Sequence, residues 1–248
     1  MYGSALSTSQ ISKLYQEGVS GYPIANAKLT DWWLLSGNTN DYSSSTSNTV
    51  PVNIIYNSIR VNSFGQMPSL LGSGLYMNGV SSNVVVSSFT PSGSVSSETQ
   101  SAWIYLNSLP QSGSYSQITW QEGYLGGLYV SSTGNVVFGA FPGGVFSSIP
   151  SNVLVSPKTW YFVSGAYSSS SGLGVCVDAV CVNTTKSGAI SSSGSFDIGA
   201  KDGTSLFFNG TIADVMVYNS VLSSSQIGLL YSSGMPITRS TSLPLGVT

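Results

Sequence analysis

Short apolar runs alternate with turns of Ser, Gly and Asn along almost the whole chain. The runs are rich in Val, Ile, Tyr and Trp, which favour strands, and hairpin signals such as SSTGN and CVDAVC separate some of them. Evenly spaced short strands of this kind predict an all-β antiparallel sandwich or barrel rather than alternating strands and helices. The expected strands lie within residues 51–61, 74–88, 101–109, 116–122, 126–141, 159–168, 173–183, 196–200 and 210–219.

Two segments depart from the strand pattern, and they nearly repeat each other. Residues 5–18 read ALSTSQISKLYQEG, and residues 221–234 read VLSSSQIGLLYSSG. In the second segment Ser223 and Gln226 form an S-x-x-Q capping box, and Gly234 can end the helix in a left-handed conformation. The sequence therefore predicts one short helix over residues 223–234 and the same capped element at the start of the chain.

Composition narrows the possible chemistry. Of the 248 residues, 41% are hydrophobic, which is enough for a core, but only 6% are charged, with 7 basic and 9 acidic side chains. Without a basic stripe, nucleic acid is not an expected partner, and no apolar run is long enough to span a membrane. The chain has no histidine, which excludes Ser-His-Asp, Cys-His and histidine-ligated zinc sites.

The two cysteines, Cys176 and Cys181, flank a candidate two-residue turn at Asp178-Ala179. In such a hairpin the cysteines form a non-hydrogen-bonded pair, where Cα atoms approach to about 4.5–5.5 Å, a separation that suits a disulfide. The alternative is two small buried hydrophobic side chains on facing strands. The rest of the composition is typical of a secreted protein, so we favour the disulfide and expect an extracellular location.

Two acceptor triplets agree with that location. NTT begins at Asn183 and NGT begins at Asn209, and both match the pattern for N-glycosylation. Such triplets also arise by chance in a chain rich in Asn, Ser and Thr. We therefore expect glycosylation at Asn183 and Asn209, and the alternative is that the two triplets occur by chance.

Several motifs, in order, resemble laminin G-like domains of the concanavalin A-like jelly-roll superfamily. Residues 206–234 resemble the closing motif, in which a G-x-I-x-D-V strand leads into a short capped helix. WWLLSGNTNDYSSSTSN resembles the opening strand and its loop, SETQSAWIYL the Trp-bearing core strand, and TWYFVSGAYSSSSGLGVCVDAV the paired strands that end in a hairpin. The resemblance covers about residues 29–237 and implies a jelly-roll sandwich of two antiparallel sheets with one short helix.

Members of this family often hold a structural calcium ion, and the matching positions here are Asp41 and Asp214. Calcium takes six to eight oxygen ligands, many of which can be backbone carbonyls. The alternative is that Asp41 makes an Asx turn and Asp214 bonds a backbone amide. Ala213 stands where many relatives carry another acidic residue, which removes one expected ligand.

The resemblance also implies a sheet face or loop rim that binds glycans. The best local match is SYSQITWQEGYLGG, where Trp120, Gln121, Glu122 and Tyr124 combine aromatic rings with polar groups that can bond sugar hydroxyls. The alternative is ordinary strand packing beside an edge loop. Adjacent strand residues face opposite ways, so we expect one member of the pair Trp32-Trp33 in the core and the other exposed.

The superfamily includes glycoside hydrolases, which need two carboxyl groups roughly 5–10 Å apart. All nine acidic residues here are isolated in sequence, and a pair would have to come from different strands, such as Glu98 with Glu122. We therefore expect a non-catalytic module of a cell-surface protein that adheres to glycans or to another surface or matrix component. The alternatives are a structural repeat that assembles head-to-tail with neighbouring copies and, less favoured, a glycoside hydrolase.

The near-repeat also predicts the domain organisation. Residues 25–238 form the jelly-roll domain, residues 1–24 are the tail of a preceding repeat or a linker, and residues 239–248 lead toward a following repeat. Alternatively, the first segment packs on a neighbouring molecule, as in strand donation.

Overall fold

The computed structural model describes residues 28–43, 47–54, 74–87, 89, 93–123 and 126–234. A short 3-10 turn, η1 (Pro142–Gly144), precedes β11, and one α-helix within these ranges, α2 (Ser224–Gly234), follows β16. The strands are β1 (Leu29–Trp33), β2 (Thr49–Val52), β3 (Leu75–Asn78), β4 (Asn83–Val86), β5 (Gly93–Val95), β6 (Ser97–Leu106), β7 (Tyr115–Gln117), β8 (Thr119–Gly123), β9 (Gly127–Ser131), β10 (Asn135–Ala140), β11 (Ser147–Leu154), β12 (Trp160–Ser168), β13 (Gly172–Val177), β14 (Val180–Thr184), β15 (Ile190–Ile198) and β16 (Asn209–Tyr218).

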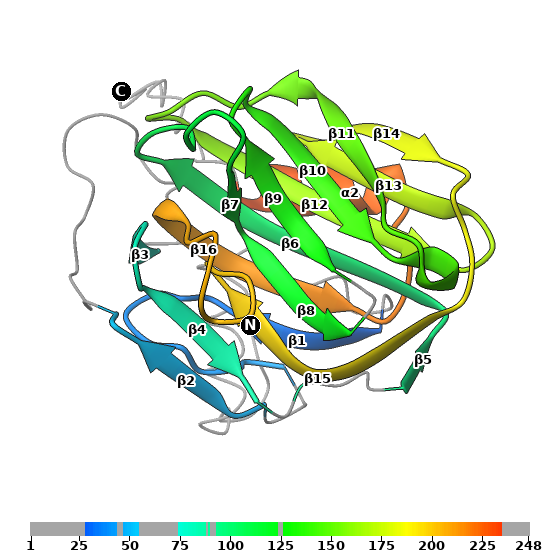
Figure 1. The fold of residues 1–248 in the computed structure, drawn as a ribbon, viewed down its shortest axis with the longest axis horizontal. Coiled ribbons are helices and arrows are strands. Elements are labelled where there is room, and N and C mark those ends of the chain that lie inside the picture. Colours follow the sequence, from blue (N-terminus) through cyan, green and yellow to red (C-terminus); the bar gives the residue numbers. More distant parts are fainter. Residues whose placement is uncertain are drawn as a thin grey trace, which may run out of the picture.

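The strands form three antiparallel sheets (Figure 1). Sheet A has seven strands in the order β1-β16-β6-β12-β13-β14, with β3 also paired to β16. Sheet B has five strands in the order β2-β4-β15-β5, with β8 also on β15, and sheet C has four strands in the order β11-β10-β9-β7. The all-β antiparallel prediction is confirmed, whereas the sheet count is three rather than the expected two.

One hydrophobic core joins the three sheets. Trp33 and Val163 contribute to it from sheet A, Phe196 from sheet B and Leu128 from sheet C. Strand β8 pairs with β15 over several residues but meets the segment before β9 at an isolated bridge, in which the Gln121 backbone N–H donates to Gly126 O at 2.8 Å. Sheets B and C therefore form one layer that is divided at β8, and sheet A forms the other layer.

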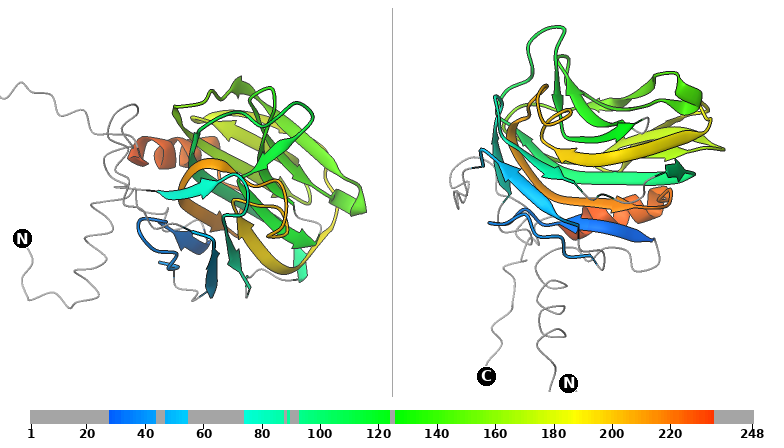
Figure 2. Two further views of the ribbon diagram at one scale, coloured as in Figure 1. Left: turned by 60° about the vertical axis from the view of Figure 1, so that its left-hand side comes forward. Right: turned by 60° about the horizontal axis from the view of Figure 1, so that its bottom comes forward.

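Helix α2 covers the outer face of sheet A. Its predicted capping box is present, because the Ser223 backbone N–H donates to Gln226 Oε1 at 2.8 Å and the Gln226 backbone N–H donates to Ser223 Oγ at 3.3 Å. Ile227 and Leu230 are buried against Trp103 and its neighbours. In the right-hand view of Figure 2, α2 and the strands of sheet C lie on opposite sides of the sandwich. None of the helices among the described residues has the length and apolar character needed to cross a membrane.

The covered outer face corrects the expectation for Trp32 and Trp33. The two side chains do point to opposite sides of β1, but both are buried, at 2% and 0% exposure. Trp33 lies in the main core, and Trp32 lies in a second cluster with Trp103, Phe162 and the residues of α2. The expectation of one exposed ring was wrong because it took no account of a helix packed on the sheet from outside.

The hairpin between β13 and β14 confirms the predicted disulfide. Cys176 pairs with Cys181 across the strands, their Cα atoms are 4.1 Å apart, and their sulfur atoms are bonded. Asp178 and Ala179 both adopt positive φ values, of 48° and 64°, which is the conformation of a type I′ turn. Asp178 Oδ1 also accepts a hydrogen bond from the Phe162 backbone at 2.9 Å, which ties the turn to β12.

Candidate functional site

A cleft lined by aromatic side chains opens on the outer face of sheet C and β8. We call it the aromatic cleft. Its volume is about 310 Å³. Its lining residues are Tyr115, Gln117, Trp120, Tyr129, Phe141, Phe146, Lys201 and Leu206.

Strand alternation and one glycine create this surface. In β9, Leu128 and Val130 face the core, so Tyr129 between them faces outward. A Cβ atom on Gly139 of β10 would lie 2.9 Å from the ring of Phe146 and 3.3 Å from that of Tyr129, so the absence of a side chain there makes room for both rings. The Tyr115 ring packs edge-on against Tyr129 with centroids 4.9 Å apart.

Trp120 forms one end of the aromatic cleft. Its indole N–H donates to Asp202 Oδ1 at 2.5 Å, and Lys201 Nζ lies 4.7 Å from its ring centroid. Both contacts come from the turn after β15, so that turn fixes the orientation of the ring. The cleft therefore combines flat apolar surfaces with a cation and a carboxylate at its edge.

The predicted cluster of glycan-binding residues is divided by the structure. Trp120 lines the cleft, and Glu122 is half-buried two residues further along β8, on the same face. Gln121 faces the other way, is 1% exposed and is hydrogen-bonded to Ser192 Oγ at 2.5 Å, so it is not placed to bond a ligand in the cleft. Tyr124 lies outside the described residues.

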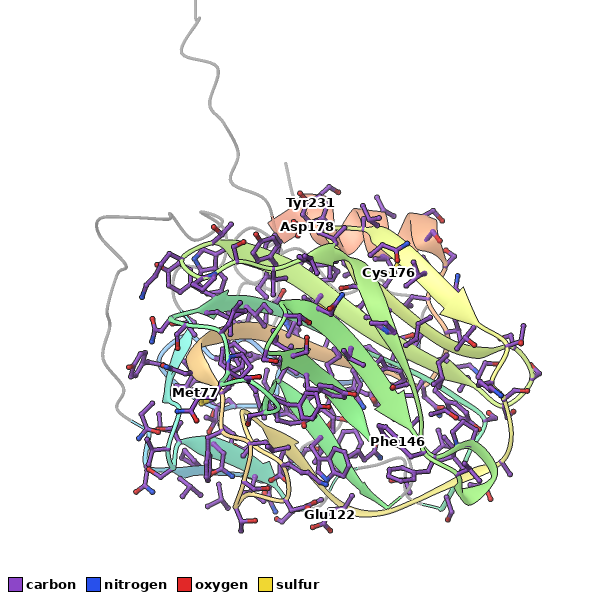
Figure 3. The ribbon with its side chains drawn as sticks, turned by 45° about the horizontal axis from the view of Figure 1, so that its top comes forward. Met77, Glu122, Phe146, Cys176, Asp178 and Tyr231 are labelled. Carbon is purple, nitrogen blue, oxygen red and sulfur yellow. A yellow bond between two sulfur atoms is a disulfide. The ribbon has the colours of Figure 1, made fainter. Side chains whose placement is uncertain are left out.

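Figure 3 places Glu122 and Phe146 far from Tyr231 on α2 and from Asp178 beside that helix. The cleft residues missed from the sequence are Tyr115, Tyr129, Phe141 and Phe146. Strand alternation in residues 127–131 could have indicated that Tyr129 faces outward. Tyr115 reaches the cleft through the pairing of β7 with β9, and Phe141 and Phe146 lie in the connection between β10 and β11, whose conformation the strand pattern does not indicate.

The two aspartates predicted to bind calcium both accept hydrogen bonds from the protein. Asp214 Oδ1 accepts the indole N–H of Trp32 at 2.6 Å, and Asp41 Oδ1 accepts the backbone N–H groups of Ser43 and Trp32 at 2.8 and 3.1 Å. Asp41 Oδ2 accepts the Ser47 backbone N–H at 3.2 Å. These bonds match the Asx-turn alternative for Asp41. The described part of the chain contains no group of three or more acidic, histidine or cysteine side chains arranged to hold a metal.

Burial strongly raises the pKa of Asp214. A bulge in β16 between Ala213 and Met216 turns Asp214 onto the outer face of sheet A, beneath Trp32. Burial raises the pKa of Asp214 to about 7, and the hydrogen bond from Trp32 acts in the opposite direction. At neutral pH this carboxyl group is therefore partly protonated.

A second buried acid lies in the core between the sheets. Burial raises the pKa of Glu98 to about 8, opposed by its bond from Gln100 Nε2 (2.8 Å), while the nearby Asp31 raises it further. With its amide turned over, Gln121 donates to both Glu98 oxygens at 3.2 and 3.1 Å and accepts from Ser192 Oγ. Glu98 is thus a member of a closed polar network with 0% exposure, out of reach of a ligand.

The two predicted glycosylation sites differ in accessibility. Asn183 is exposed on β14. Asn209 is half-buried, and its amide group donates to Ser108 Oγ at 3.1 Å and accepts from Asn107 Nδ2 at 3.1 Å. Modification of Asn209 would require these bonds to break, so Asn183 is the better placed acceptor.

Comparisons with known proteins bear on the fold. The sequence model of a family described as the concanavalin A-like lectin/glucanases superfamily matches residues 72–228, more than half of the chain. No curated protein matches. Among solved structures, the binding domain of botulinum neurotoxin DC in complex with SialylT is 16% identical, with a TM-score of 0.61 over 85% of this chain and 52% of that chain.

Two further solved structures give similar values. One concerns botulinum neurotoxin type C, whose cell entry is described as dependent upon interaction with two ganglioside molecules (14% identity, TM-score 0.62, 84% of this chain and 51% of that chain). The other is the binding domain of Paraclostridial Mosquitocidal Protein 1 (14% identity, TM-score 0.61, 83% of this chain and 52% of that chain). This chain spans about half the length of these chains, and at such identities the likeness shows the fold. With the family match, it establishes that the chain belongs to the concanavalin A-like lectin/glucanase superfamily.

Proposed function

We propose that this chain is a non-catalytic module that binds glycans in the aromatic cleft. The observation that carries the proposal is the set of five aromatic side chains on a face that no other described element covers. Aromatic rings stack on the C–H faces of sugars, and a few polar groups at the edge of such a site fix the orientation of the ligand. Trp120 with Lys201 and Asp202 provides this combination.

The comparisons support the same class of ligand. The superfamily is named for lectins and glucanases, and two of the similar structures concern proteins whose descriptions mention SialylT or gangliosides. An extracellular, cell-surface location is part of the proposal, supported by the Cys176–Cys181 disulfide and the exposed acceptor at Asn183.

A hydrolase is the less favoured function because of where the acids lie. Glu98, which we considered as half of a catalytic pair, is enclosed in the core with Gln100. Asp197, the nearest buried acid to Glu122, is 1% exposed. A general acid must reach the glycosidic oxygen, and neither of these carboxyl groups reaches solvent.

A glycan array with the full chain tests this proposal. We expect wild-type protein to bind a subset of glycans, and both Trp120→Ala and Tyr129→Ala to lose that binding. Trp160→Ala is the matched control, since Trp160 packs on Tyr105 on the opposite, outer face of sheet A. Equal binding by wild type and Trp120→Ala would contradict the location of the site, and a blank array would contradict the function.

The near-repeat of residues 5–18 and 221–234 favours a second candidate function. Residues 5–18 lie outside the described residues, but their sequence repeats the segment that forms α2 and packs on Trp103. A second helix of this type would need an apolar sheet face of the same kind, which a neighbouring copy could provide. Light scattering of the chain with and without residues 1–24 tests this: loss of self-association on truncation supports assembly, and a monomer in both forms contradicts it.

A further inference from the structure

Two buried polar side chains lie on the outer face of sheet B without a full set of hydrogen-bond partners. Asn83 on β4 is 0% exposed and Asp197 on β15 is 1% exposed. Their strand neighbours Val84, Phe196 and Ile198 face the core, so Asn83 and Asp197 face outward. Neither amide atom of Asn83 has a hydrogen-bond partner among the described residues, and the carboxylate of Asp197 is approached only by the backbone N–H of Gly203.

The turn after β15 encloses these side chains. Lys201 and Ser205 bridge its ends, with the Lys201 backbone N–H donating to Ser205 O at 2.8 Å. Gly203, with φ of 63°, lies directly over the pair: a Cβ atom there would be 3.3 Å from Asn83 Nδ2 and 3.8 Å from Asp197 Oδ1. Both side chains therefore point toward the same covered space beneath the turn.

The surroundings of this space are negative. The carboxylates of Glu122 and Asp202 lie close enough to Asp197 to act on its charge, and the backbone N–H of Gly203 faces it. Lys201, the cation on the turn, lies over the ring of Trp120 instead.

We propose that Asp197 and Asn83 bind a calcium ion beneath the 201–205 turn. The Asp197 carboxylate and Asn83 Oδ1 are the hard oxygen donors that calcium prefers, and backbone carbonyls and water complete its six to eight ligands. The irregular turn suits calcium better than magnesium, which demands a near-ideal octahedron. This site lies on sheet B and shares no residue with the Asp41 and Asp214 positions that the family resemblance implied.

The ion would also act on the aromatic cleft. The same turn carries Asp202, which bonds the indole of Trp120, and Lys201, which lies over its ring. Calcium would hold the turn on the sheet and so keep Trp120 in place. This consequence, unlike the site itself, rests on the proposed glycan function.

Metal titration of the full chain after chelator treatment tests the site. We expect calcium to raise the melting temperature at concentrations up to about 10⁻³ M, the range of weak extracellular calcium modules. Terbium, a calcium substitute, should give luminescence sensitised by nearby tryptophan, and calcium should displace it. Asp197→Asn, a nearly isosteric change that removes the buried charge, should fold and lose both signals, and Asn83→Ala should weaken them.

Asp41→Asn is the matched control and should retain both signals. The proposal is overturned if wild type shows neither signal, if Asp197→Asn retains them, or if Asp41→Asn rather than Asp197→Asn removes them. Calcium binding with a blank glycan array would leave the calcium site intact and contradict the glycan function. Conversely, glycan binding that is unchanged by a chelator, with no terbium signal, would contradict only the calcium site.

Discussion

Trp32, Trp103 and Phe162 lie beneath helix α2 on one outer face of the sandwich, whereas Trp120, Tyr129 and Phe146 line an open cleft on the other. The two faces carry similar side chains at similar strand positions. They differ in what covers them, because α2 packs on sheet A and no described element packs on the cleft. An aromatic residue on a strand is therefore part of a core or of a binding surface according to the neighbour that the fold supplies.

Each face also contains an indole hydrogen-bonded to an aspartate. Trp32 donates to the buried Asp214 at 2.6 Å, and Trp120 donates to the exposed Asp202 at 2.5 Å. A carboxylate that is removed from water depends on its remaining partner, whereas an exposed carboxylate can exchange that partner for water. The two hydrogen bonds have nearly equal lengths, but the bond from Trp32 should contribute more to the free energy of unfolding than the bond from Trp120.

The largest expected difference is in the stability cost of removing a whole indole. Trp103 is 2% exposed and packs against Phe162 and Tyr231 with ring centroids 5.5 and 5.9 Å away, so Trp103→Ala should lower the free energy of unfolding by about 3–5 kcal/mol. Trp120→Ala should cost about 1 kcal/mol, because the ring is only half-buried. Urea denaturation of the two variants provides the measurement. Equal losses would show that the cleft is packed as tightly as the covered face.

The sequence was most informative where the structure is local. The capping box at Ser223 and Gln226 and the hairpin at Cys176 and Cys181 each involve residues a few positions apart, and both are confirmed. The fold class followed from strand patterning, but the division of one layer into two sheets did not, because it depends on which strand β8 pairs with. The burial of Trp32 also depends on a contact between distant segments, because its cluster includes residues of α2, which lies nearly 200 residues further along the chain.

The candidate site was predicted only in part. Trp120 was identified because an aromatic residue beside polar groups is visible in sequence, but Gln121 was included although neighbouring strand residues face opposite ways. The cleft needs Tyr115 on β7, Tyr129 on β9 and Phe146 in the loop before β11, and strand pairing with that loop brings them together. The surroundings of Asp197 were not expected, because its isolation from other acids in sequence conceals its proximity to Glu122 and Asp202 in space.

The pH dependence of the free energy of unfolding should report on the buried carboxyl groups, one of which, Asp214, lies on the face covered by α2. The pKa of Asp214 is raised from 3.8 to about 7 by burial, so its neutral form stabilises the fold. That contribution is complete below the unfolded-state pKa and is lost as pH rises through about 7, by a total on the order of a few kcal/mol. Glu98, with its pKa raised to about 8, acts in the same direction.

The chain should therefore be more stable at acidic than at alkaline pH. Guanidinium denaturation at intervals from acidic to alkaline pH measures the slope, and Asp214→Asn should flatten the part between the ordinary pKa of 3.8 and the raised pKa of about 7. Stability that rises with pH across this interval in wild type would contradict the assignment of buried, partly protonated carboxyl groups.

The smallest expected difference isolates the two indole hydrogen bonds. Trp32→Phe and Trp120→Phe each remove one N–H donor while keeping an aromatic ring. Trp103→Phe is the matched control in the covered cluster, because the Trp103 indole N–H has no partner among the described residues and its replacement removes volume alone.

We expect Trp32→Phe to cost about 1–3 kcal/mol more than Trp103→Phe, since it leaves a buried carboxyl group without its donor. Trp120→Phe should cost at most about 0.5 kcal/mol, because water can replace the lost bond to Asp202. The excess for Trp32→Phe should grow as pH rises, because the Trp32 N–H favours the charged form of Asp214 and lowers its pKa. Equal costs for Trp32→Phe and Trp103→Phe at alkaline pH would mean that Asp214 finds another partner or admits water. In that case burial by α2 would no longer distinguish the two faces of the molecule.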